Sequence, residues 1–224
     1  YEIDHCLVGS EMCIRDRIKG IVAAIDRDNI DTDQIIPTEY LKSIKKFGFE
    51  DYLFDGWRYL DDGKLGVAKE ERKINKDFIL NKAPYDKAKV LLTRDNFGCG
   101  SSREHAVWAL RDFGIQVVIA SSFGDIFYNN CFKNGVLPIK LEKEQVESLF
   151  LKIKDKPSDF SVSLDSKKLE LIDGTEYDFQ VEDNLIERII YGLDDVDMTL
   201  MHKDKIKAFE VNRIREKPWI YAND

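Results

Sequence analysis

Residues 90–110 read VLLTRDNFGCGSSREHAVWAL, and this stretch combines an apolar run, a glycine–serine loop and a helical pattern. The apolar run 90–92 predicts a buried strand, and residues 106–110 predict a helix. Gly98 and Gly100 let the backbone between them turn tightly and approach a ligand closely. Because a helix directs free N–H groups and its positive dipole end toward such a loop, the stretch predicts an anion site.

Three polar side chains, Ser101, Ser102 and Arg103, stand where this helix is expected to begin. The arginine offers a planar fork that matches a carboxylate, and ligands of open α/β sheets bind at the carboxyl ends of strands. A serine oxygen facing a helix N-terminus and an arginine could be stabilised as an alkoxide and act as a base. The segment Ser101 to Glu104 also fits Ser-x-x-Glu, the capping box. Spacing alone leaves both interpretations open.

Other nucleophile and phosphate motifs fit this loop poorly. The chain has no Gly-x-x-x-x-Gly-Lys-Ser/Thr segment and no Gly-x-Ser-x-Gly elbow. Cys99 could be a thiol nucleophile with His105 as its base, but no third orienting residue is evident.

Composition limits the classes of function. The chain has 224 residues, enough for one domain with a sizeable core, and its net charge of −8 argues against a nucleic-acid partner. No apolar run approaches the roughly 20 residues of a membrane span, so we expect no membrane partner. Four scattered cysteines without a Cys-x-x-Cys pair indicate a reducing compartment, and we expect a cytoplasmic protein.

Strand and helix patterns alternate through the middle of the chain and then give way to short alternating strands. This order predicts an α/β fold with a mixed sheet, in which a parallel core is followed by an antiparallel hairpin and a helical C-terminal tail. The expected strands are 18–25, 90–93, 115–120, 136–140, 160–164, 169–172 and 177–181, and the expected helices are 102–113, 125–133, 142–154 and a tail from 184.

Several segments outside these elements carry expectations of their own. Residues 1–17 lack a regular pattern, and we interpret them as a tag, an upstream fusion or a sequence error. The single domain is expected to span 18–212, and 213–224 to form a basic and polar tail. A carboxylate-rich loop at 31–37 precedes Thr38, a candidate cap for a short helix that reaches Lys46. The charged, glycine-containing stretch from Asp61 to Arg72 is the best candidate for a mobile loop.

The block Asn96 to Ala106 resembles the swivelling domain of the aconitase superfamily, a β/β/α domain, and other blocks agree in the same order along the chain. Within that superfamily the match is to the isopropylmalate dehydratase small subunits, from about Ile18 to Glu210. The further blocks are DTDQIIP (31–37), FDGWRY (54–59), DFILN (77–81), FGDIFYNN (123–130), GVLP (135–138), GLDD (192–195) and TLMH (199–202).

The resemblance implies an activity, a cofactor and a partner. Enzymes of this family are hydro-lyases that move a hydroxyl group between adjacent carbons by dehydration and rehydration. For this family the reaction is the interconversion of 2-isopropylmalate and 3-isopropylmalate in leucine biosynthesis. A [4Fe-4S] cluster, carried by a separate large subunit, acts on the leaving hydroxyl. The resemblance implies no metal on this chain and a heterodimer or heterotetramer with the large subunit. A homoaconitate or methyl-malate enzyme, and a non-catalytic carboxylate-binding module, are the alternatives.

The resemblance also implies roles for single residues. Ser101 takes the position of the catalytic base and Asp33 that of an active-site carboxylate, although Asp33 could instead form an Asx-turn or a helix cap. Ser102 and Arg103 correspond to carboxylate-binding positions. The remaining assignments are substrate contact for Tyr40, Leu41 and Lys42, with Leu41 against an isopropyl group, and loop or supporting positions for Asn96, Gly98, Gly100 and His105. Ile44 falls where aconitase itself has an arginine, which speaks against citrate. Lys45 or Lys46 could supply charge there.

Overall fold

The computed structural model describes residues 17–42, 46–154 and 156–220. Its strands are β1 (Arg17–Ala24), β2 (Val90–Leu92), β3 (Val117–Ala120), β4 (Leu137–Lys140), β5 (Asp159–Ser163), β6 (Lys168–Leu171) and β7 (Glu176–Asp178). Its α-helices are α1 (Thr32–Ile35), α2 (Asp55–Arg58), α3 (Glu104–Phe113), α4 (Asp125–Lys133), α5 (Lys143–Ile153), α6 (Asp183–Tyr191), α7 (Asp195–Leu200) and α8 (Lys203–Glu216). Short 3-10 helices lie at Thr38–Lys42, Glu50–Tyr52, Lys69–Glu71, Ile79–Asn81, Tyr85–Lys87 and Pro218–Ile220.

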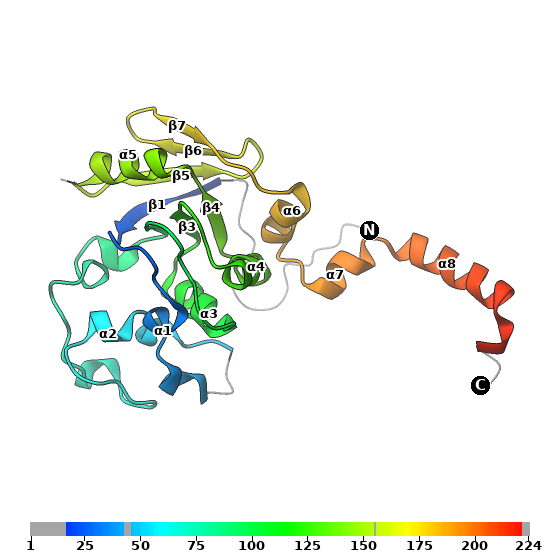
Figure 1. The fold of residues 1–224 in the computed structure, drawn as a ribbon, viewed down its shortest axis with the longest axis horizontal. Helices are drawn as coiled ribbons and strands as arrows, with labels where there is room; N and C mark the ends of the chain where they lie inside the picture. Colours follow the sequence, from blue (N-terminus) through cyan, green and yellow to red (C-terminus); the bar gives the residue numbers. More distant parts are fainter. Residues whose placement is uncertain (1–16, 43–45, 155, 221–224) are drawn as a thin grey trace. The chain divides into compact units, whose positions relative to one another are not determined.

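The strands form one sheet in the order β4-β3-β2-β1-β5-β6-β7 (Figure 1). Strands β1 to β4 pair in parallel, whereas β5, β6 and β7 continue the sheet from β1 in antiparallel pairs. The mixed sheet expected from the sequence is therefore confirmed. β1 joins the two halves, because it pairs with β2 on one side and with β5 on the other.

Alternate residues of the parallel strands point into two separate apolar clusters. Leu91 and Val118 belong to the cluster that includes the buried face of α3, whereas Val90 and Val117 belong to the cluster that includes α5. Helices thus cover both faces of the parallel half, as expected for strands that are apolar on both sides. The first cluster also packs under the loops that follow β1 and β2, and so supports the candidate site.

Several element bounds differ from those expected. Helix α3 begins at Glu104 instead of Ser102, because Arg103 keeps an extended backbone conformation (φ −130°, ψ 115°). The segment after Thr38 is a 3-10 helix that ends at Lys42. Strand β1 already includes Arg17, which pairs with Ser163. Ile44 and Lys45 lie outside the described residues, as does most of the N-terminal leader.

The chain divides by its contacts into two units, one up to Gly192 and one from Leu193. In the second unit, Asp194 caps α7 through the backbone N–H groups of Val196 and Asp197. No residue of α7 or α8 is buried. The domain boundary expected after residue 212 stays a prediction. None of the helices in the described part of the chain is long and apolar enough to cross a membrane.

Candidate active site

The loops that follow β1 and β2 are joined by backbone hydrogen bonds. The N–H of Gly98 donates to the carbonyl of Ile30 (2.7 Å), and the N–H of Thr32 donates to the carbonyl of Cys99 (3.0 Å). The Thr32 hydroxyl adds a third contact to the carbonyl of Ser101 (3.2 Å). The carboxylate-rich loop and the glycine–serine loop, far apart in sequence, therefore form one surface at the carboxyl ends of two parallel strands.

A close approach of backbone to the next helix explains the first glycine of the loop. Gly98 has φ +71°, and a Cβ added there would lie 2.2 Å from Cγ of Phe127 on α4. Gly124 packs from the other side, because its own Cβ would lie 2.5 Å from the carbonyl oxygen of Gly98. The N–H of Gly124 donates to the carbonyl of Phe97 (2.9 Å). The loop is thus held by both neighbouring strand ends, and only glycine fits at these two points.

Asp33, Thr38 and Arg103 form the polar centre of this surface. The Arg103 Nη1 donates to Oδ1 of Asp33 and to the Thr38 hydroxyl (3.2 Å), and that hydroxyl donates to the same Asp33 oxygen (2.7 Å). The hydrogen bond from Thr38, together with Arg103, lowers the pKa of Asp33 and outweighs its partial desolvation. The side chain of Asp33 is 55% exposed and that of Arg103 is 18% exposed, so the pair is open to solvent. A carboxylate arriving from solvent could therefore reach the guanidinium.

Ser101 and Ser102 are both exposed on this surface. The capping-box interpretation of Ser101 is wrong, because the N-cap of α3 is Arg103, whose side chain makes no cap hydrogen bond. Ser101 lies two residues before that cap, outside the position that a capping box requires. Its contact with the site runs through its carbonyl oxygen, which accepts from Thr32.

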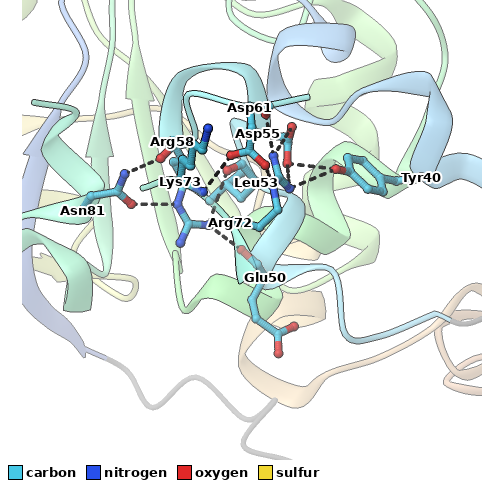
Figure 2. Close-up of polar contacts among 9 residues, drawn as sticks. All are labelled: Tyr40, Glu50, Leu53, Asp55, Arg58, Asp61, Arg72, Lys73 and Asn81. Atoms are coloured by element: carbon cyan, nitrogen blue, oxygen red, sulfur yellow. Dashed lines mark hydrogen bonds and ion pairs between the residues drawn. The ribbon is translucent and has the colours of Figure 1, made fainter. Parts of the chain in front are cut away.

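The three predicted substrate contacts after Pro37 differ in their surroundings. Lys42 is exposed, and Leu41 is half-buried against the core cluster. Tyr40 is fully buried, and its hydroxyl donates to Oδ1 of Asp55 (2.9 Å), well inside the protein (Figure 2). In this structure Tyr40 therefore does not face the surface that carries Arg103, contrary to the expectation. The exposed Lys46 contacts Arg111 through its carbonyl oxygen (2.8 Å).

The supporting positions hold the loop and its helix in place. Asn96 adopts a left-handed conformation (φ 58°), and its side chain donates to the side chain of Asn29 (2.7 Å). Gly100 also has a positive φ, +94°. The ring of His105 packs against those of Phe49 and Trp108, and burial lowers its pKa. A histidine in this setting fits packing better than proton transfer.

Cys99 and Cys131 do not provide the donor set of an iron–sulfur cluster. Burial, with Asp31 nearby, raises the pKa of the Cys99 thiol, and complete burial raises that of Cys131 well above its usual range. A thiolate ligand or nucleophile needs the opposite shift. Among the residues that the structure describes, no three His, Cys, Asp or Glu side chains gather in a way that could hold a metal ion.

Sequence reasoning missed the role of Thr38 and the pairing of Arg72 with Asp55. Thr38 was expected to cap a helix, but its hydroxyl joins Asp33 to Arg103. The sequence predicts a mobile loop that ends at Arg72, but the arginine is buried and pairs with Asp55 (2.8 Å). A buried arginine needs a carboxylate partner, and the acidic residues around position 55 were the available signal.

A family model for the C-terminal domain of aconitase matches residues 13–144. The 3-isopropylmalate dehydratase small subunit of Nitrosomonas eutropha is 50% identical over 210 residues, which cover 92% of this chain and 98% of that protein. The chain belongs to the 3-isopropylmalate dehydratase small-subunit family. A model for the C-terminal domain of these dehydratase small subunits matches residues 195–222.

Further relatives agree with this family of hydro-lyases. The 3-isopropylmalate dehydratase small subunit of Neisseria gonorrhoeae is 48% identical over 206 residues, which cover 92% of this chain and 97% of that protein. The crystal structure of a 3-isopropylmalate dehydratase from Methanocaldococcus jannaschii aligns with a TM-score of 0.58 and 27% identity, covering 87% of this chain and 99% of that chain. The swivelling-domain fold expected from the sequence is that of the dehydratase small subunits.

Proposed function

We propose that this chain, with a separate large subunit, interconverts 2-isopropylmalate and 3-isopropylmalate by dehydration and rehydration. Family membership supports this reaction class. The observation that carries the proposal for this chain is the meeting of Arg103 with Asp33 beside the exposed Ser101, on a surface made from two strand ends. The proposal assigns carboxylate binding to the arginine and proton transfer to the serine.

In this proposal Ser101 is the base. Its deprotonated oxygen takes the proton from the carbon next to the hydroxyl-bearing carbon. The hydroxyl leaves as hydroxide on the side of the large subunit, and a double bond remains between the two carbons. For rehydration to the isomer, Ser101 gives the proton to the carbon that lost the hydroxyl, and hydroxide adds to the carbon that lost the proton. Ser102 and Arg103 hold a substrate carboxylate, for which the guanidinium fork is suited. Asp33 orients the reacting groups and stays ionised at neutral pH, because its pKa is lowered.

The selectivity for the isopropyl group is assigned to the segment after Pro37. Leu41 is half-buried and apolar, and Lys42 beside it is an exposed cation that can attract a second carboxylate. Tyr40 is assigned a supporting role instead of a substrate contact, because it is buried. Asn96, Gly98, Gly100 and His105 are assigned to holding the loop and its helix.

The [4Fe-4S] cluster is assigned to the large subunit, in a heterodimer or heterotetramer. The two cysteines of the described residues have raised pKa values and do not fit a cluster, so no step of this proposal runs through them. The cytoplasmic location remains a prediction from cysteine usage.

The proposal is tested by assaying the purified chain alone, the large subunit alone and their mixture. We expect turnover of isopropylmalate in the mixture only. Turnover by this chain alone would contradict the proposal. Preferential turnover of homoaconitate or a methyl-malate would show that this compound, and not isopropylmalate, is the substrate. Binding of malates by the mixture without turnover would favour a carboxylate-binding module.

Ser101→Ala tests the base in the assembled enzyme. We expect kcat to fall by about 10²–10⁴-fold, the usual contribution of a positioned base, with an unchanged melting temperature. Ser166→Ala, a change at an exposed serine between β5 and β6, is the control and should keep kcat. Full activity of Ser101→Ala would remove Ser101 from the mechanism.

A further inference from the structure

A buried polar cluster lies directly beneath the segment Thr38–Lys42. The carboxylate of Asp55 accepts hydrogen bonds from the Tyr40 hydroxyl (2.9 Å) and from Nη1 (2.8 Å) and Nη2 (3.3 Å) of Arg72 (Figure 2). The side chains of Arg72 and Asp55 are only 4% and 6% exposed. Burial and the Asp55 carboxylate raise the pKa of Tyr40, so its hydroxyl keeps its proton and remains a donor.

The two ends of the cluster are anchored independently. Arg72 also donates through Nε to the Asp61 carboxylate (2.9 Å) and through Nη2 to the carbonyl of Asp61 (2.9 Å). Arg58 closes the α2 helix that begins at Asp55, and it donates to the carbonyl of Glu50 (2.7 Å). The position of the Asp55 carboxylate is therefore fixed by its own helix and by the segment that carries Arg72.

The backbone at Gly63, in the segment that leads to Arg72, packs closely against Tyr40. A Cβ added to Gly63 would lie 1.6 Å from the Tyr40 hydroxyl and less than 3 Å from both Asp55 carboxylate oxygens. Gly63 thus packs directly onto Tyr40, and the buried Arg72 anchors the end of the stretch 61–72 that was expected to be mobile. The ring of Tyr40 is held as well, because it stacks on Tyr52 at 3.9 Å between centroids.

A single short helix joins this cluster to the candidate active site. Tyr40 and Thr38 belong to the same 3-10 helix, and Thr38 bridges Asp33 and Arg103 through its hydroxyl. Leu41 and Lys42, the proposed substrate contacts, follow Tyr40 in that helix. A displacement of Tyr40 would therefore also move Thr38, Leu41 and Lys42, which belong to the same helix.

A buried ion pair is weak evidence for stability, because apolar side chains of similar volume often serve equally well. The same pair fixes the relative positions of its side chains, because the bidentate Arg72 and the Tyr40 hydroxyl hold the Asp55 carboxylate in one orientation. The arrangement is thus better suited to placing Tyr40 than to adding free energy of folding.

We propose that Asp55, Arg72 and the Tyr40 hydroxyl are positioning residues that set the substrate-binding geometry of the Thr38–Lys42 helix. The inference rests on the proposed function, because it assigns that helix to the substrate. The cluster touches no reacting atom. Its effect is to hold Leu41 and Lys42, and through Thr38 the Asp33–Arg103 pair, in the arrangement that binds a substituted malate.

Tyr40→Phe removes the hydroxyl and keeps the ring, and the assembled enzyme is the form to assay. We expect KM for isopropylmalate to rise about tenfold with kcat within about threefold of wild type, because lost placement of binding groups acts on substrate affinity. Tyr59→Phe is the matched control. Tyr59 is also buried and packs against Arg72, but its hydroxyl has no protein hydrogen-bond partner among the described residues. Its KM should stay within twofold.

A second variant guards against loss of folding. Arg72→Lys keeps the charge and loses the fork, and we expect it to raise KM in the same direction with an unchanged far-UV circular dichroism spectrum. Unchanged KM in folded Tyr40→Phe and Arg72→Lys would overturn the positioning role. A fall in kcat that matches the fraction of unfolded protein, at constant KM, would also overturn it. Absence of isopropylmalate turnover by the wild-type mixture would instead contradict the proposed function itself.

Discussion

Arg103 donates a hydrogen bond to the carboxylate of Asp33, a residue 70 positions earlier in the sequence. The contact brings a cation from the start of α3 to a carboxylate on the short helix α1. A substrate carboxylate would have to compete with Asp33 for the same guanidinium.

Arg103→Lys should weaken substrate binding without unfolding the chain. Lysine keeps the charge but presents a point charge instead of a planar fork, so a carboxylate loses one of its two hydrogen bonds. We expect KM of the assembled enzyme to rise about 10–100-fold, which corresponds to about 1.4–2.8 kcal/mol. Steady-state kinetics measure this, with Arg17→Lys, a change in the exposed pair with Glu170, as the control. Equal KM values in the two variants would contradict a role of Arg103 in binding.

Thr38→Val should raise the pKa of Asp33. The Thr38 hydrogen bond is the main cause of its lowered pKa. A lowered folded pKa means that the ionised carboxylate stabilises the fold above its unfolded pKa of 3.8, and that this contribution is lost as pH falls through the folded value. Side-chain carboxyl NMR should show a higher midpoint for Asp33 in Thr38→Val. Thr175→Val, a change at a threonine that hydrogen-bonds to Asp173, should leave the Asp33 midpoint in place.

Gly98→Ala should destabilise the chain more than Gly174→Ala. Both glycines have positive φ, but an added Cβ would meet Phe127 at Gly98 and nothing within 4 Å at Gly174. We expect a loss of about 1–3 kcal/mol beyond the shared backbone strain, the range for overpacking of a well-packed site. Chemical denaturation of the two variants gives the difference, and equal losses would show that the helix can move aside.

Arg72→Met should be strongly destabilising, because it leaves the buried Asp55 carboxylate without its cation. Loss of one partner of a buried pair costs about 3–5 kcal/mol. The double variant Asp55→Leu/Arg72→Met should recover part of this loss, since no charge remains buried. Lys152→Met, at the more exposed pair with Asp173, should have a much smaller effect. Urea unfolding of the wild type, of the single variants Arg72→Met, Asp55→Leu and Lys152→Met, and of the double variant measures these terms. A double variant as unstable as the sum of Arg72→Met and Asp55→Leu would contradict the coupling.

His105 should make the fold less stable in mild acid. Burial lowers its pKa below the ordinary 6.5, so the unfolded chain binds the proton first. Its neutral form stabilises the fold above pH 6.5, and that stability is lost as pH falls toward the folded pKa. His105→Phe should flatten the pH dependence of the melting temperature as the pH falls below 6.5. An unchanged slope would show that other groups cause it.

The sequence predicted the mixed sheet because its strands differ in pattern. Residues 117–120 are apolar on both sides, and the later strands alternate, as in β5, where Phe160 and Val162 are buried between half-exposed neighbours. Helix α3 ends at Phe113, where the pattern predicts it, and is followed by Gly114 with a left-handed backbone. Strand patterns and the end of a helix depend on residues close together in the sequence, so a sequence pattern can predict them.

The rest depended on contacts between distant residues. The capping box from Ser101 to Glu104 satisfies every local rule, yet Arg103 stays extended and starts α3 later. The extended loop is held instead by backbone hydrogen bonds to Ile30 and by packing on Phe127. The resemblance implied a substrate contact for Tyr40, but its hydroxyl is buried against Asp55 and Arg72, which no local pattern links to it.

The central place of β1 in the sheet has a consequence during synthesis. β1 is the first strand of the described chain, yet its antiparallel neighbour β5 ends at Ser163. Until the ribosome has released that later segment, one edge of β1 carries unpaired backbone groups, which are a template for pairing with other chains. We therefore expect the nascent chain to be most exposed to aggregation before residue 163 has been synthesised.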